Sequence, residues 1–166
     1  MRAFFYMVLA IILLSILVTP LVEVFLVGRE KMNLSSAIYN SFRAAKESSY
    51  AYLAMRNIDV LVDEETFLRN FAGTFATSFG MNCQNPTANP MRFVSIDDSP
   101  NGYNEYIVSV DFEYEYDEDR NATAVVTVTA ESEYRFRTGY MQALSYGDAN
   151  PFLITDTRTF KMEIAN

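Results

Sequence analysis

The sequence predicts an α+β fold, with a long N-terminal helix, a second short helix and an antiparallel β-sheet of three or four strands. Three observations support this fold class. An apolar run without charged residues extends from Ala3 to Val22, apolar residues then recur at helical spacing up to Gly80, and from Met91 onward they alternate with polar residues. We therefore expect a membrane or filament-core helix over residues 1–28 and an extracytoplasmic α+β head over residues 29–166.

The first segment, Ala3 to Val22, is long enough to cross a membrane. About 20 helical residues at ~1.5 Å each span the ~30 Å hydrocarbon core of a bilayer. Three interpretations remain open: a cleaved secretory signal, an isolated transmembrane anchor, and a rod that packs against other rods in an assembly. We favour the rod because residues 22–62 contain no proline and only Gly28, so the helix does not stop where the membrane ends.

The helix is expected to continue over residues 29–62, with one face half-buried on the head. This face carries apolar and small residues at three- and four-residue spacing: Leu34, Ile38, Phe42, Ala45, Ser49 and Tyr52. Pro20 removes a backbone hydrogen bond, which predicts a kink or local unwinding near Ile16 to Pro20. Glu23 is expected either to reach the lipid headgroups or to meet an arginine or an N-terminal amine on a neighbouring rod.

A second helix is predicted over residues 63–80. Asp63 is a candidate N-cap, Glu64 and Glu65 suit the first turn, and Gly80 can end the helix. Its apolar stripe predicts core positions: Phe67, Leu68, Phe71, Ala72, Phe75 and Phe79. Residues 81–90 are rich in turn formers and predict a loop. This loop contains Cys83, whose thiol is expected to be buried and idle or to form an intermolecular disulfide.

The sheet is predicted over residues 91–166. A short strand is expected from Arg92 to Ile96, two long strands over 103–116 and 122–137 that form a hairpin, and a last strand from Phe152 to Ile164. The first long strand has a wet, acidic face with Asp111, Glu113 and Glu115. A helical layer should cover the opposite, apolar face.

Composition excludes several classes of function. The net charge of −8 is unsuited to nucleic acid, and without histidine the usual zinc sites and Ser/His or Cys/His catalytic pairs are unavailable. We expect no enzyme activity, no cofactor and no metal site. The nearest approach to a cation site is the turn with Asp117, Asp119 and Asn121, which lacks the later ligands of a calcium loop. Asn33 and Asn121 begin N-glycosylation sequons.

The N-terminal third resembles a known family. An apolar helix, the exit sequence VEVFLVGRE and the amphipathic segment SSAIYNSFRAAKESSYAYLA are similar to those of TadE-like minor pseudopilins, of the tight-adherence (Tad) branch of type IV pilus machinery. In that family an acid followed by Gly-Arg marks the exit from the membrane, and Glu23, Gly28 and Arg29 would fill those places. Pilins usually carry a glutamate at the fifth mature position, where this chain has Phe5.

The resemblance implies a structural subunit of a type IV pilus-like (Tad-type) extracellular filament or of its assembly complex. The subunit would be held in the membrane before assembly, would join copies of itself or other pilin-like subunits through its N-terminal helix, and would carry its head outside the cell. The residues assigned to assembly are Ala3, Ala10, Leu13, Ser15, Pro20, Glu23 and Arg29. The alternative is a solitary membrane-anchored extracytoplasmic binding domain.

Overall fold

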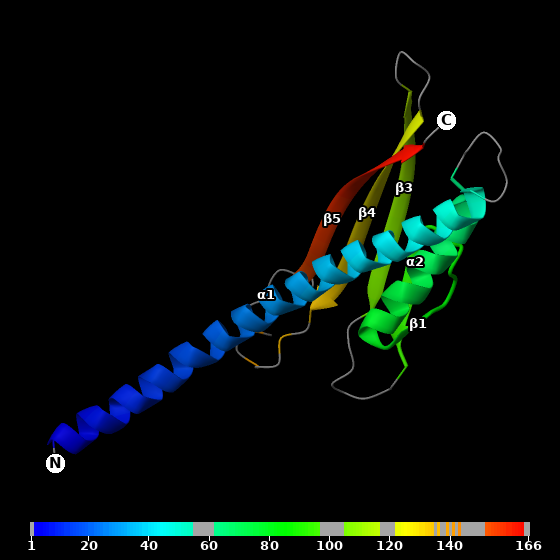
Figure 1. Ribbon diagram of the computed structural model, residues 1–166. Coiled ribbons are helices and arrows are strands. Elements are labelled where there is room, and N and C mark those ends of the chain that lie inside the picture. Colours follow the sequence, from blue (N-terminus) through cyan, green and yellow to red (C-terminus); the bar gives the residue numbers. More distant parts are fainter. Residues whose placement is uncertain are drawn as a thin grey trace.

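A long helix projects from an α+β head in the computed structural model (Figure 1). The structure describes residues 2–54, 62–96, 105–116, 122–134, 136, 139, 141, 143 and 152–164. Two helices and five strands lie in these ranges, in the order α1, α2 and β1 to β5. The predicted α+β class is confirmed.

Helix α1, Arg2–Ala54, is continuous and contains Pro20. At ~1.5 Å per residue it is about 80 Å long. The predicted kink near Pro20 is absent, and Figure 1 shows a straight rod through this region. Thr19 donates its hydroxyl to the Ser15 carbonyl oxygen at 2.9 Å in this turn, and the structure offers no reason why Pro20 leaves the helix straight. Val62 is not helical, so the predicted end at residue 62 is too late.

The second half of α1 packs on the head as its pattern predicts. Five members of the apolar stripe are at most 6% exposed: Leu34, Ile38, Phe42, Ala45 and Ser49. Arg43 and Glu47 lie off the stripe, are exposed, and form an ion pair at 3.0 Å. Burial of this stripe holds the second half of α1 against the head.

Helix α2, Glu64–Phe79, begins and ends at the residues that the sequence indicates. The Asp63 carboxylate accepts hydrogen bonds from the backbone N–H and the hydroxyl of Thr66, at 3.2 and 2.8 Å. Gly80 closes the helix in the left-handed region, at φ 61°, and donates its backbone N–H to the carbonyls of Ala76 and Thr77. All six predicted core residues of this helix are buried.

The sheet is antiparallel, and its strands lie in sequence order. They are β1, Met81–Cys83; β2, Met91–Ser95; β3, Tyr106–Tyr116; β4, Ala122–Tyr134; and β5, Phe152–Ile164. The prediction of three or four strands misses β1, which falls within the predicted loop over residues 81–90. Three residues are too few to show an alternating pattern, and β1 is held by pairing with Phe93 to Ser95 and by the buried side chain of Met81.

Both helices cover the same face of the sheet. Phe67 and Phe75 of α2 contact Phe112 and Tyr106 of β3, with ring centroids 5.3 and 6.0 Å apart, and Phe42 of α1 stacks on β5. The other face is mostly polar. It carries the exposed acids predicted for β3 and hydroxyl pairs between β4 and β5. The head is therefore a two-layer structure with its core between the helices and the sheet.

Candidate functional site: the apolar rod and its junction with the head

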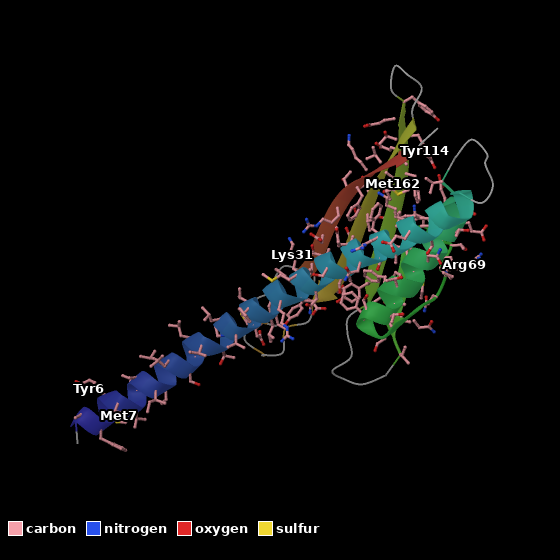
Figure 2. The ribbon with its side chains drawn as sticks, in the orientation of Figure 1. Tyr6, Met7, Lys31, Arg69, Tyr114 and Met162 are labelled. Carbon is pink, nitrogen blue, oxygen red and sulfur yellow. The ribbon has the colours of Figure 1, made fainter. Side chains whose placement is uncertain are left out.

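The rod, defined here as residues 3–22 of α1, carries the most unusual surface of the chain. Its large apolar side chains are 39 to 73% exposed over the whole circumference, among them Phe5, Leu13 and Leu17. Figure 2 shows Tyr6 and Met7 near its tip, pointing away from the helix axis and far from the head. By length and composition α1 can cross a membrane, and a signal sequence would pass the same test.

Water alone is a poor environment for this surface. Each fully exposed Leu, Ile or Phe side chain forgoes about 1.5–3 kcal/mol that burial would provide. A helix that is apolar all round is normally buried, either in a membrane or in a protein core. Since the described head covers α1 only beyond the rod, the rod requires lipid or other polypeptide around it.

The assembly residues predicted on the rod occupy more than one face. Ala3 and Ala10 are seven residues apart and therefore share a face, as do Leu13 and Pro20. Ser15 lies on a different side from Ala10. All except Pro20 are exposed, and Pro20 is half-buried. The structure thus brings together two of the three small residues, Ala3 and Ala10, and leaves a bulky apolar surface elsewhere.

Glu23 lies at the junction between the rod and the head. Its position differs from both predictions, which placed it at the lipid headgroups or against a neighbouring rod. Its side chain is only 3% exposed, so the fold of the chain itself covers it. A carboxylate that reached headgroups or a neighbouring rod would have to be exposed. Arg29, the other charged residue of the exit sequence, is exposed.

The junction is fixed by a polar contact between α1 and β3. The hydroxyl of Tyr106 donates to a carboxylate oxygen of Glu30. Tyr106 itself is 1% exposed, and its ring packs against Phe79 at 4.8 Å and Phe75 at 6.0 Å. Because Tyr106 is held in the core, this bond ties the start of the head-bound half of α1 to the sheet.

Metal ions have no evident place in the described ranges, where no group of three acidic, cysteine or histidine residues comes together. Asp117, Asp119 and Asn121 lie outside the described residues. Asn33 is exposed on α1, where its sequon lies within the helix. Cys83 is half-exposed at the sheet edge, and burial raises the pKa of its thiol, so the reactive thiolate is disfavoured.

The sequence-based predictions do not include one group of hydrogen-bonded polar residues, formed by Asp156, Arg158 and Ser35. Asp156 and Arg158 lie on the inward face of β5, between Ile154 and Phe160, and Asp156 is 9% exposed. Arg158 donates to Asp156 at 3.2 Å and to the Ser35 hydroxyl of α1 at 2.6 Å. The signal was available, since these two charges interrupt an otherwise apolar alternation in the last strand.

Fold and junction together define a class of protein: an α+β head carried on a single apolar helix. Comparison with known proteins adds no closer assignment, because no family model, curated protein or solved structure matches this chain. The resemblance to TadE-like pseudopilins therefore stays a prediction.

Proposed function

We propose that the protein is a structural subunit of a type IV pilus-like (Tad-type) extracellular filament or of its assembly complex. The subunit polymerises through the rod with copies of itself or with other pilin-like subunits. Before assembly the rod lies in the membrane, and the head lies outside the cell. The role is structural and requires no catalysis.

The observation that carries this proposal is the continuity of α1. A single helix is bare and apolar over residues 3–22 and buried on one face from Leu34 to Ser49. An anchor for an independent binding domain needs only a hydrophobic segment and a tether. A rod fused rigidly to its head fixes the orientation of the head, which a regular filament requires of every subunit.

Retention of the rod in the mature protein is part of the proposal. The sequence Val18-Thr19-Pro20 is a poor match to the small-residue cleavage site of a secretory signal, and the helix runs through it unbroken. The apolar run is also longer than the 7–15 residues of a typical signal core. These features favour a retained helix.

Electron microscopy of protein from the native host, with rod variants, tests the proposal. Leu13→Arg places a charge at the middle of the rod, at a cost of about 2.5–3.5 kcal/mol in an apolar environment. The matched control is Met32→Arg, which changes another exposed apolar residue of the same helix beyond the rod. We expect filaments from the wild type and from Met32→Arg, and none from Leu13→Arg.

Because Leu13→Arg can also impair membrane insertion, Ala10→Phe provides a second variant that keeps the rod apolar. It should insert into the membrane normally and assemble poorly, since a bulky ring at a small-residue position separates adjacent helices. Filaments of normal number and length from both variants would contradict the proposal. A dispersed wild-type monomer at native expression would instead support the solitary membrane-anchored binding domain.

A further inference from the structure

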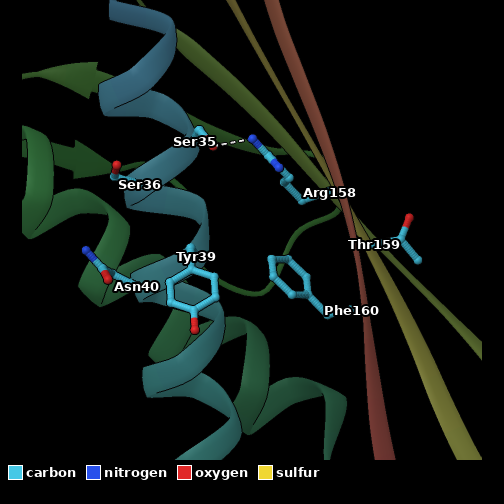
Figure 3. Close-up of a pocket in the computed structure, with 7 residues that line it drawn as sticks. All are labelled: Ser35, Ser36, Tyr39, Asn40, Arg158, Thr159 and Phe160. Carbon is cyan, nitrogen blue, oxygen red and sulfur yellow. Dashed lines mark hydrogen bonds between the residues drawn. The ribbon is translucent and has the colours of Figure 1, made fainter. Parts of the chain in front are cut away.

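A hollow of about 600 Å³ lies between α1 and β5, well away from the rod. Its volume is in the range of small-molecule sites, about 300–1,000 Å³. Figure 3 shows its lining, in which four residues come from α1 and three from β5: Ser35, Ser36, Tyr39, Asn40, Arg158, Thr159 and Phe160. The Thr159 side chain points away from α1 and pairs with Thr127 on the opposite face of the sheet. The hollow combines one cation, several hydroxyl and amide groups and two aromatic rings.

The cation is held in a fixed orientation. Arg158 donates from Nε to Asp156 at 3.2 Å and from Nη2 to the Ser35 hydroxyl at 2.6 Å, and its side chain is 52% exposed. A guanidinium has five N–H donors, so these two bonds leave three for a ligand. Asp156 does not line the hollow. Arg158 is thus oriented by Asp156 and Ser35 while part of its guanidinium faces solvent, which suits the bidentate binding of a carboxylate.

The rest of the lining favours a ring that carries hydroxyl groups. Phe160 is held by stacking on Phe42 at 4.0 Å, and Tyr39 lies 6.3 Å from Phe160 and is 57% exposed. The two rings offer apolar faces, and the Asn40 amide offers a donor and an acceptor. Ser36 lies one helical turn away, donates its hydroxyl hydrogen to the Met32 carbonyl oxygen at 2.9 Å, and so offers its oxygen as an acceptor. Flat C–H surfaces beside hydroxyl groups are the chemistry of a sugar.

We propose that this hollow binds an acidic saccharide, one that carries a uronic acid. Arg158 binds the carboxylate, Tyr39 contacts a face of the sugar ring, and Ser36 and Asn40 bind its hydroxyl groups. An acidic peptide can also bind Arg158 and hydrogen-bond to Ser36 and Asn40, but its acidic side chains lack the flat C–H ring face that a sugar presents to Tyr39. The proposal is independent of filament formation, because none of these residues lies on the rod.

Nuclear magnetic resonance titration of the full chain tests this site. The protein is kept in a phosphocholine detergent, because maltoside and glucoside detergents present sugars of their own. The probes are methyl glucuronide, methyl glucoside as its neutral counterpart, and acetate as a bare carboxylate. We expect methyl glucuronide to shift the amide signals of residues 35–40 and 158–160 and to bind at least ~10-fold more tightly than either of the other probes, about 1.4 kcal/mol.

Two variants and one matched control locate the effect. Arg158→Gln should weaken glucuronide binding at least ~10-fold, and Tyr39→Ala, at an exposed position that the fold does not need, should weaken it several-fold. Lys161→Gln removes one positive charge from the opposite face of the same strand and should leave binding unchanged. Equal binding of acetate or of methyl glucoside, shifts elsewhere in the chain, or equal loss in Lys161→Gln would each overturn the proposal.

Discussion

Replacing Phe75 by alanine should destabilise the head more than any change on the rod. Phe75 is 0% exposed and lies where α2 meets β2 and β3. Its ring centroid is 4.7 Å from that of Phe93, 5.2 Å from Phe79 and 6.0 Å from Tyr106. Truncation of such a residue leaves a cavity that rigid neighbouring rings fill only in part, and the expected loss of stability is about 3–5 kcal/mol.

Thermal unfolding of the full chain in detergent, followed by near-ultraviolet circular dichroism, measures this loss. At ~4 °C per kcal/mol the melting temperature of the head should fall by roughly 10–20 °C. The control is Phe25→Ala, which removes the same side chain from a position that is 73% exposed and should change stability by less than ~0.5 kcal/mol. If the two variants melt at the same temperature, the packing described for the head is wrong.

Four further predictions concern α2: its two ends, its middle and its contact with the sheet. Asp63→Ala should lower the free energy of unfolding by about 1 kcal/mol at neutral pH. Hydrogen bonds from Thr66 hold the pKa of Asp63 below its ordinary value. In urea unfolding, the stabilisation by Asp63 should therefore be complete above about pH 4 and should fade as the pH falls through the lowered pKa. Burial and the nearby Glu64 carboxylate raise the pKa of Tyr114 to about 12, so carbon NMR should show this ring ionising near pH 12 in the wild type and at lower pH in Glu64→Gln. Gly80→Ala should destabilise by about 1–2 kcal/mol because φ is 61° there, whereas Gly73→Ala, with free space around the added carbon, should stabilise by about 0.5–1 kcal/mol.

Most of the secondary structure could be predicted because its signals are local. The stripe from Phe67 to Phe79, the Asp63 cap and the Gly80 stop all lie within or next to one helix, and the bounds of β5 agree with those predicted. The miss at β1 has a non-local cause, since this strand depends on its partner β2. The presence of Pro20 alone does not predict a kink, since α1 is straight through it.

The candidate sites were less predictable than the fold. The apolar rod is evident from composition, but the burial of Glu23 depends on tertiary contacts, which periodicity does not specify. The hollow joins Ser35 to Arg158, residues 123 positions apart in the chain. The sequence contains one indication of this hollow: the charged residues Asp156 and Arg158 interrupt the apolar face of β5.

The central claim, that the mature protein keeps its rod as one piece with the head, is tested most directly by mass spectrometry of protein from the native host. The segment Ala3–Arg29 contains no internal lysine or arginine, so trypsin releases the whole rod as a single peptide. We predict that this peptide, or a form shortened by only a few residues at its N-terminus, is recovered from the assembled material. A native N-terminus that begins after Val22 would contradict the account, because the segment proposed to drive assembly would then be a discarded signal.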